Sequence, residues 1–150
     1  MKQNENIILK VKKLDASLPD PAYARAGDAG IDLYSKIDII LAPLSRALVP
    51  TGIAVSIPHG YAGFVQPRSG LAAKHGIGIV NSPGLIDSGY RGEVCVILIN
   101  TDREANYHIK KGDRICQLVI KKVEYVDIKI VNELDDTERG GGGFGSTEKQ

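Results

Sequence analysis

Short apolar runs bounded by glycine or proline recur along the whole chain, and in several of them apolar and polar positions alternate. Runs of this kind are typical of β-strands. We expect strands at residues 7–12, 37–41, 47–49, 53–57, 61–66, 77–80, 94–99 and 114–131. The last run alternates cleanly from Tyr125 to Ile130, so it is expected to remain a strand to its end. The pattern predicts an all-β fold: a sandwich, a jelly roll or a barrel.

One short segment, residues 69–75, has the character of a helix. Ser69 stands where the N-cap of such a helix would be, and serine oxygens commonly cap the first free amides. Gly76 stands where the helix would end, since glycine adopts the left-handed conformation of a C-cap without strain. We therefore expect a single short helix, from Ser69 to His75, between strands.

Composition and charge narrow the class of protein. The chain has 150 residues, 43% hydrophobic and 25% charged, which suits one globular domain with its own core. A net charge of +1 does not fit a protein that binds nucleic acid or a membrane surface, because such proteins normally carry a basic excess. No apolar run approaches the length of a membrane span, and the N-terminus lacks a signal-peptide pattern. We expect neither nucleic acid nor a membrane as a partner.

Both cysteines, Cys95 and Cys116, lie inside apolar runs. This placement favours buried thiols in a reducing compartment, and two cysteines are too few for a zinc site or a disulfide framework. The expected location is the cytoplasm, with residence in the nucleus left open.

The end of the chain differs from the rest. From about Thr137 it contains Arg139, glycines at 140–143, Phe144, Gly145, Ser146 and Thr147. Such a stretch does not form a core, because glycine has no side chain to bury and loses much freedom on ordering. One cation, one aromatic ring and two hydroxyls suit closure over a ligand that is flat at one end and anionic at the other, as a phosphorylated nucleoside is. On composition alone, a disordered linker explains this stretch equally well.

Two parts are therefore expected: a β domain at residues 1–136 and a flexible, glycine-rich arm at residues 137–150. The familiar phosphate-binding motifs do not describe the arm. The dinucleotide fingerprint would have to open a helix, and a P-loop would need a lysine where Gly145 stands.

Two turns carry polar groups that a plain β-sandwich does not require. Residues 27–33 place Asp28 and Asp32 in a glycine-containing turn, although an Asx turn alone accounts for Asp28. In residues 112–118, Gln117 interrupts an apolar run. It is either the exposed member of an alternating strand or a donor directed at a phosphate.

The start of the predicted helix suits an anion. Free backbone amides and the positive end of the helix dipole attract phosphate at such a position. Arg68 adds a bidentate donor and Ser69 a hydroxyl. A structural alternative, in which Ser69 only caps the helix, does not exclude contact with phosphate.

Residues 80–93 predict a hairpin with apolar flanks. Asp87 follows two aliphatic residues, so desolvation is expected to make it a better base than a surface aspartate. Asn81 offers donors and an acceptor, enough to read one edge of a base, and Tyr90 offers a flat face to a sugar. Taken alone, Asp87 is better explained as a residue that closes a turn before Gly89.

Together with the arm, these segments resemble, in order, the five motifs of the homotrimeric dUTP diphosphatase (dUTPase) family. The matching stretches are residues 29–33, 67–70, 84–92, 112–117 and 139–147. Each motif alone is weak evidence, whereas all five in the same order are specific. The resemblance implies a distorted jelly-roll (β-clip) subunit in a homotrimer with three active sites. Each site would take its first, second and fourth motifs from one chain, the third from a neighbour and the arm from the last.

The resemblance also implies the activity: hydrolysis of dUTP to dUMP and pyrophosphate with Mg²⁺. Such an enzyme limits the incorporation of uracil into DNA and supplies dUMP for thymidylate synthesis. By position, Asp87 would activate the water that attacks the α-phosphorus, and Ser69 would be the second catalytic residue. Asp32 would help to place the substrate-borne Mg²⁺ through water. The implied phosphate ligands are Arg68, Ser69, the Gly70 amide and Gln117, joined from the arm by Arg139, Ser146 and Thr147, and Gly145 is implied as a further contact with the substrate.

Selectivity for the nucleoside is implied for the third motif. The implied contacts with uracil are the Asn81 side chain and backbone groups around Leu85, Ile86 and Cys95. A close backbone approach would leave no room for the methyl group of thymine. Tyr90 against the sugar would exclude a 2′-hydroxyl, and Phe144 of the arm would stack on the uracil ring.

Three other functions stay open. A dCTP deaminase of the same fold would need a glutamate base and a different third motif. A nucleotide-gated regulatory protein of this fold usually carries an inserted segment, which is not seen among the motifs. A purely structural trimeric β module gives no reason for Arg139 and Phe144 in the arm. One departure from the family pattern is that Glu148 and Lys149 follow Thr147, where many relatives carry a glycine. A carboxylate beside the outer phosphates is unfavourable.

Overall fold

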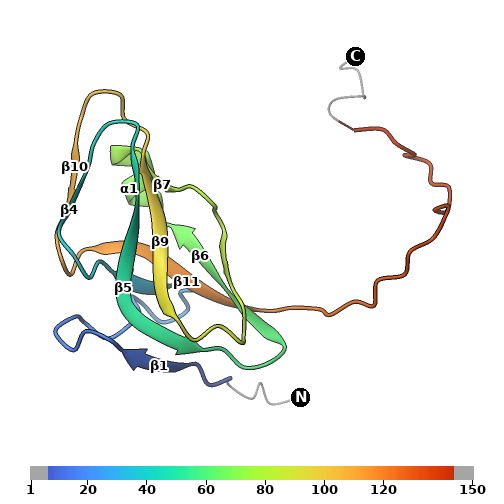
Figure 1. Ribbon diagram of the computed structural model, residues 1–150, viewed down its shortest axis with the longest axis horizontal. Coiled ribbons are helices and arrows are strands. Elements are labelled where there is room, and N and C mark those ends of the chain that lie inside the picture. Colours follow the sequence, from blue (N-terminus) through green and yellow to red (C-terminus); the bar gives the residue numbers. More distant parts are fainter. Residues whose placement is uncertain (1–6, 144–150) are drawn as a thin grey trace.

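The computed structural model describes residues 7–143, and in it two antiparallel sheets pack face to face around one apolar core (Figure 1). The first sheet has the order β1 (Lys10–Lys13), β5 (Arg46–Ser56), β9 (Glu93–Asn100), β7 (Ile77–Ile79). The second has the order β2 (Ala22–Tyr23), β3 (Ile31–Tyr34), β11 (Arg114–Lys122), β6 (Tyr61–Pro67), β8 (Gly84–Ile86). A separate ribbon pairs β4 (Ile39–Leu41) with β10 (Tyr107–Ile109). The predicted all-β, jelly-roll-like class is confirmed.

Alternation along the strands separates an inner from an outer face in each sheet. In β9, every second residue is buried, beginning at Val94, and the residues between them are half-buried. In β3, Ile31 and Leu33 point into the core, while Asp32 and Tyr34 point outward. The buried residues of both sheets form a single cluster. Polar residues that alternate with core residues along a strand must therefore point away from the core, on the outer face of their sheet.

The predicted helix is confirmed as α1 (Ser69–His75), and Gly76 ends it in the left-handed conformation with φ of 64°. The predicted cap is wrong. Arg68 is the N-cap, in an extended conformation, and no side chain caps the helix. Ser69 is the first helical residue, so its hydroxyl is not used as a cap. No helix among residues 7–143 is both long enough and apolar enough to cross a membrane.

Two of the predicted strands differ from the structure at one of their bounds. The first begins at Lys10 and not at residue 7, and β11 ends at Lys122, well before residue 131. The amide of Val123 donates to the carbonyl of Gly60 at 2.9 Å, and from there the chain extends away from the body (Figure 1). Residues 124–136, here called the extended segment, pair with no strand of the described chain. The alternation of apolar and polar residues was not sufficient to form a strand here, because a strand also needs a partner for its backbone groups.

The predicted hairpin at residues 80–93 is confirmed in outline. β7 and β9 pair, with Ile79 opposite Leu98. Between them, β8 crosses to the other sheet and pairs with β6, with Ile86 opposite Gly63. A Cβ at Gly63 would press on the side chains of Ile86 and two other core residues, so glycine permits this crossing. The connection thus ties both sheets together.

Candidate active site

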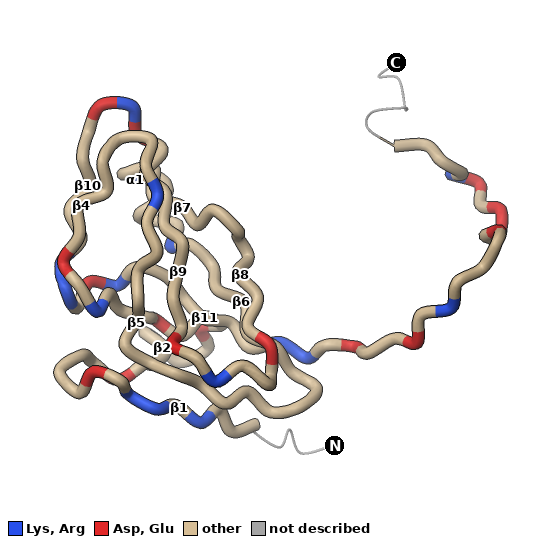
Figure 2. Tube along the Cα trace, in the orientation of Figure 1, with Lys and Arg blue, Asp and Glu red and all other residues tan. Residues whose placement is uncertain are grey.

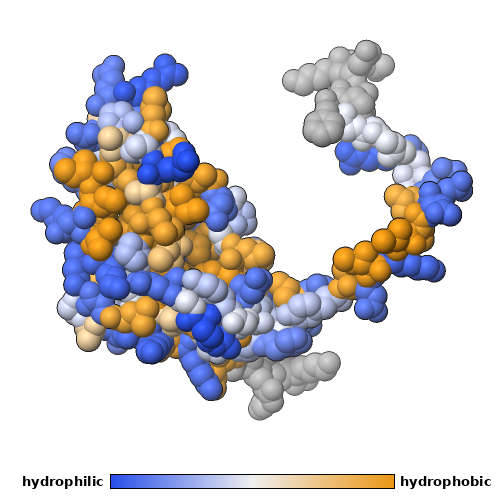
Figure 3. Space-filling view, in the orientation of Figure 1, coloured by the Kyte–Doolittle hydropathy of each residue, from blue (hydrophilic) through white to orange (hydrophobic). Residues whose placement is uncertain are grey.

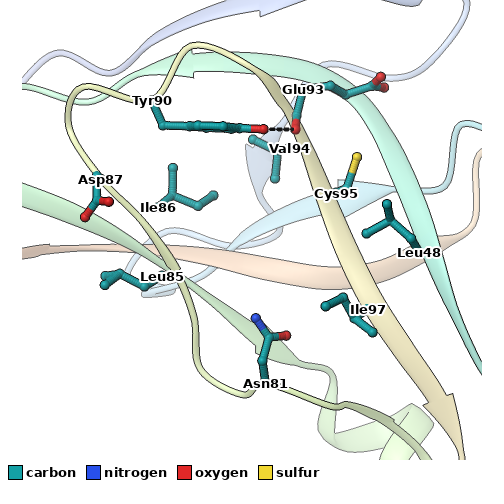
Figure 4. Close-up of a pocket in the computed structure, with 10 residues that line it drawn as sticks. All are labelled: Leu48, Asn81, Leu85, Ile86, Asp87, Tyr90, Glu93, Val94, Cys95 and Ile97. Atoms are coloured by element: carbon teal, nitrogen blue, oxygen red, sulfur yellow. Dashed lines mark hydrogen bonds between the residues drawn. The ribbon is translucent and has the colours of Figure 1, made fainter.

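A cleft of about 360 Å³ opens on the outer face of the first sheet (Figure 4). Outward-facing residues of β5 and β9 line one side, and the connection that contains β8 lines the other. The lining residues are Leu48, Asn81, Leu85, Ile86, Asp87, Tyr90, Glu93, Val94, Cys95 and Ile97. We call it the tyrosine cleft. It brings together Asp87 and the residues that the sequence assigned to base and sugar, apart from Phe144.

The Tyr90 ring is positioned by backbone contacts at the cleft (Figure 4). Its hydroxyl donates to the carbonyl of Glu93 at 3.0 Å. Its amide donates to the carbonyl of Asp87 at 3.1 Å, which closes the turn between them. Gly92 leaves space for the ring, since a Cβ at this position would overlap the tyrosine hydroxyl.

Asp87 lies at the rim of the tyrosine cleft with its side chain exposed. Ile86 points into the core and is 8% exposed, whereas Leu85 points outward and is 61% exposed. The expected desolvation of Asp87 by these two neighbours is therefore wrong for a single chain. Strand alternation turns one of them away from the carboxylate and leaves the other in water.

The properties of two further side chains of the cleft, Glu93 and Cys95, depend on charge and on burial. The Glu93 carboxylate accepts the Gly52 amide at 2.9 Å and pairs with the Lys36 ammonium at 3.3 Å. Burial, with a smaller contribution from the charge of Glu93, raises the pKa of the Cys95 thiol. In the core, burial raises the pKa of Cys116 to about 12. Both cysteines are free thiols, Cys116 buried as predicted and Cys95 half-buried. Both remain protonated at neutral pH and are poor nucleophiles.

Two predicted site residues, Asp32 and Gln117, lie on the outer face of the second sheet. Asp32 on β3, Gln117 on β11 and Gln66 on β6 stand side by side in register. They line a cleft of about 470 Å³. The Gln117 amide donates to the carbonyl of Pro67 at 3.2 Å. A Cβ at Gly30 would collide with the end of the Gln117 side chain, so a glycine is required beside it.

Asp32 is paired with two arginines. Its carboxylate lies 3.2 Å from Arg114 Nη1 and 3.9 Å from Arg68 Nε, and its side chain is only 13% exposed. Arg68 also donates to the carbonyl of Arg114 at 3.2 Å. We call Asp32, Arg68, Arg114 and Gln117 the arginine cluster. Two cations against one carboxylate leave it with a positive charge, which suits an anion.

Arg114 is a site residue to which the sequence-based prediction assigned no role of its own. Its position beside Asp32 depends on the pairing of β11 with β3, which has an irregularity between Arg114 and Cys116. Ser69 and Gly70 follow Arg68 directly and are exposed. Arg139 is exposed, and its Nε donates to the carbonyl of Gly142 at 3.0 Å. The other predicted arm residues, Phe144, Gly145, Ser146 and Thr147, lie outside the described residues.

The side chains of the arginine cluster favour indirect contact with a metal ion, through water, over direct ligation. Within residues 7–143, no group of three or more His, Cys, Asp or Glu side chains is arranged to hold a metal ion. The charge of Asp32 is already offset by two arginines. With its charge already offset, the Asp32 carboxylate suits contact with a hydrated cation through water better than direct ligation of a bare ion.

The tyrosine cleft and the arginine cluster lie far apart in one chain. They open on the outer faces of opposite sheets. Within the second sheet, Asp32 and Ile86 are separated by three strand spacings and about three residue steps, roughly 17 Å. A carboxylate at Asp87 therefore does not contact a phosphate held by the arginine cluster of the same chain.

Comparison with known proteins gives consistent matches. A sequence model of the dUTPase family matches residues 16–148. The chain is 54% identical, over 139 residues, to the deoxyuridine 5'-triphosphate nucleotidohydrolase of Thermobifida fusca, covering 93% of this chain and 78% of that protein. It is 55% identical, over 141 residues, to the Corynebacterium glutamicum protein of the same name, covering 94% and 95%.

Solved structures match with similar consistency. The dUTPase of Staphylococcus bacteriophage 80alpha with dUPNHPP superposes with a TM-score of 0.88 at 32% identity, covering 96% of this chain and all of that one. A mutant dUTPase of phage phi11 of S. aureus, described with a structural Mg(II) ion, has a TM-score of 0.79 at 29% identity. That match covers 85% of this chain and 98% of that one.

Replacing Gly92 tests whether it positions Tyr90. In Gly92→Ala, the new Cβ would displace the tyrosine hydroxyl from the Glu93 carbonyl, and the ring would shift into or away from the cleft. We expect the free energy of unfolding, measured by urea denaturation, to fall by about 1 kcal/mol, since the hydrogen bond of the Tyr90 hydroxyl is lost. Gly89→Ala is the matched control, because a Cβ at Gly89 meets nothing within 4 Å. Equal stabilities for the two variants would contradict the role of Gly92.

Proposed function

The chain belongs to the dUTPase family, and on this premise we propose that it hydrolyses Mg²⁺-bound dUTP to dUMP and pyrophosphate in active sites shared between copies of the chain. It is a dUTP diphosphatase, like the curated bacterial relatives to which it is 54% and 55% identical over most of its length. The observation that carries the shared-site mechanism is the separation of the tyrosine cleft from the arginine cluster on opposite faces.

The tyrosine cleft would bind the deoxyuridine part of the substrate. Its volume suits a nucleoside, and its apolar floor strengthens hydrogen bonds to the base. β8 is an edge strand, so backbone groups on one side of Leu85 have no strand partner among residues 7–143 and would be available to uracil, together with the Asn81 amide. Cytosine would leave donors and acceptors unmatched in this slot, which is costly once water is excluded. Tyr90 would pack on the sugar and reject a 2′-hydroxyl.

The arginine cluster would bind the triphosphate. Arg68 and Gln117, with the Ser69 hydroxyl and the Gly70 amide beside them, would donate to phosphate oxygens. Magnesium carried by the substrate would offset part of the phosphate charge, and Asp32 would accept hydrogen bonds from its water ligands. The charge on Asp32 would also keep Arg68 and Arg114 in place before the substrate arrives.

Asp87 would act as the general base. Its carboxylate would take a proton from a water molecule as the water oxygen bonds to the α-phosphorus. The bond from that phosphorus to the bridging oxygen then breaks, and pyrophosphate leaves with the negative charge. Arg68 and, from the arm, Arg139 would stabilise that charge, and Ser69 would hold the reacting phosphate. General-base assistance of this kind is typically worth about 10²–10⁴-fold. The exposure of Asp87 in a single chain is consistent with a phosphate presented by another copy.

Exposed apolar residues support an assembly. In the extended segment, Val126, Ile128 and Ile130 are 76%, 88% and 94% exposed, and on the first sheet Leu48 is 63% exposed. Figure 3 shows apolar surface both over β5 and β9 and along the extended segment. Contiguous apolar surface of this kind is usually covered by a partner. We propose a homotrimer in which the arm, residues 137–150, closes a site formed by the two other copies.

The cellular role follows from the reaction. Removal of dUTP in the cytoplasm would limit uracil in DNA, and the dUMP formed would be available for thymidylate synthesis. The phage 80alpha dUTPase is described as controlling the transfer of virulence genes by a proto-oncogenic G protein-like mechanism. We favour the enzymatic role for this chain because its curated relatives at 54% and 55% identity are nucleotidohydrolases.

A panel of nucleotides tests the proposed reaction. The protein is incubated with dUTP, dCTP, dTTP or UTP plus Mg²⁺, and pyrophosphate and ammonia are assayed. We expect pyrophosphate from dUTP only, and loss of that activity when EDTA removes the metal. Ammonia from dCTP would identify a deaminase instead, and binding of dUTP without either product would identify a regulatory protein.

Replacing Asp87 tests the general base. In Asp87→Asn, the side chain keeps its size but no longer accepts the proton, so kcat is expected to fall by at least about 10³-fold. Binding of dUPNHPP, measured by calorimetry, should change little. Glu104→Gln, which neutralises an exposed carboxylate far along the chain, serves as the control and should retain full activity. Substantial residual turnover in Asp87→Asn would reject the assigned role.

A further inference from the structure

A second, strongly basic groove lies at the edge of the first sheet, outside the proposed site. It has a volume of about 370 Å³ and is lined by Lys10, Val11, Lys12, Ala54, Val55, Ser56 and Arg91. β1 is the edge strand of this sheet. Lys10 and Lys12 are two residues apart on it, so their side chains share one face. The lining contains three cations and no carboxylate. We call it the basic groove.

None of its three cations pairs with a carboxylate of the described part of the chain. The ion pairs found among residues 7–143 include neither Lys10 nor Lys12, and they do not include Arg91. Arg91 is tied to the backbone instead, donating to the carbonyls of Ser88 at 2.6 Å and Tyr90 at 2.9 Å. These bonds fix its guanidinium on the loop that carries Asp87 and Tyr90. The basic groove and the tyrosine cleft thus lie on two sides of one loop.

The chain also contains an uncompensated acidic stretch. Residues 133–138 read Glu-Leu-Asp-Asp-Thr-Glu, with four carboxylates and no cation, immediately before Arg139. All are exposed, and none takes part in the ion pairs of the described chain. Figure 2 shows these acidic residues on the part of the chain that extends away from the body, and the basic residues of β1 on the body itself.

We propose that the basic groove receives the acidic stretch of a second copy of the chain and thereby holds residues 139–143 of that copy beside the tyrosine cleft. Opposite charges favour the encounter, and several pairs formed at once act together more effectively than one exposed pair. The inference rests on the proposed function, since it assumes that the arm closes a site on another copy.

The spacing along the sequence fits this arrangement. Glu138 and Phe144 are six residues apart, which allows at most about 20 Å of chain between them. Arg91 of the groove and Tyr90 of the cleft are adjacent residues. An acidic stretch docked at Arg91 would therefore hold the glycines of the arm beside the cleft and raise their effective concentration there. Docking would act on how tightly the substrate is enclosed rather than on the chemical step.

Reciprocal charge reversal tests the contact. The groove variant is Lys10→Glu with Lys12→Glu, and the stretch variant is Asp135→Lys with Asp136→Lys. Each is expected to raise KM for dUTP by about tenfold with little change in kcat, because like charges then repel the arm. The chain that combines all four changes should recover most of the wild-type KM. Lys74→Glu with Arg103→Glu changes the net charge equally, away from the groove, and controls for long-range effects on the anionic substrate.

Mixing the two variants identifies the chain that supplies the stretch. The groove variant and the stretch variant are unfolded, mixed and refolded together, with circular dichroism and size-exclusion chromatography to confirm folding and assembly. Docking between copies predicts a population of sites with a restored, low KM, since a reversed groove meets a reversed stretch only across chains. A mixture that keeps the high KM of both variants, while the four-change chain is restored, would place the contact within one chain and overturn the proposal.

A milder variant covers the case in which charge reversal prevents assembly. In Lys10→Gln with Lys12→Gln, KM should depend less steeply on salt concentration, from about 20 mM to about 500 mM, than in the wild type, since two screened contacts are gone. Equal slopes would reject the docking. Deleting residues 137–150 separates the inference from the proposed function: if the deletion abolishes turnover while all groove variants keep wild-type KM, only the docking fails. If the deletion has no effect, the proposed role of the arm fails.

Discussion

The burial of one side chain, Ile86, determines the form of the loop that lines the proposed active site. Ile86 is 8% exposed and pairs with Gly63 of β6, where a larger residue would press on it. This contact draws the connection between β7 and β9 across to the second sheet. Because its neighbours in sequence must then point outward, Leu85 and Asp87 lie at the cleft and not in the core (Figure 4). Asp87 is therefore held on a short, well-anchored strand end, and a water molecule can reach it.

The same alternation separates the two halves of the proposed chemistry. Asp32 and Gln117 point outward from the second sheet, while the cleft with Cys95 lies on the outer face of the first. A single copy thus presents the half proposed to bind the base on one side and the half proposed to bind the phosphates on the other. In the proposed homotrimer, assembly would bring complementary halves together, and this would account for the exposure of Asp87 and of the apolar surface in a single chain. The substrate would join surfaces that folding alone keeps apart.

Much of this was predictable from the sequence, within limits set by distance along the chain. The helix from Ser69 to His75 is a local structure, ended by Gly76, and was predicted correctly. The strand from Arg114 was predicted nine residues too long, to residue 131 and not Lys122, because alternation reports a tendency and not a partner. The pairing of Asp32 with Arg114, like the burial of Ile86 away from Asp87, depends on the register between distant strands. The role of the arm residues beyond Gly143 stays a prediction.

Complementation between two inactive variants tests most directly whether each site is built from more than one copy. Asp87→Asn alters the tyrosine cleft and leaves the arginine cluster intact, whereas Arg68→Ala alters the cluster and leaves the cleft intact. Each variant alone should be nearly inactive, because every one of its sites lacks one of the two groups. When equal amounts are unfolded, mixed and refolded as trimers, about a quarter of the sites should combine an intact cleft with an intact cluster. The account therefore predicts that roughly a quarter of the wild-type dUTP hydrolysis returns on mixing. Activity that stays at the level of the separate variants would show that each site lies within one chain, and would contradict it.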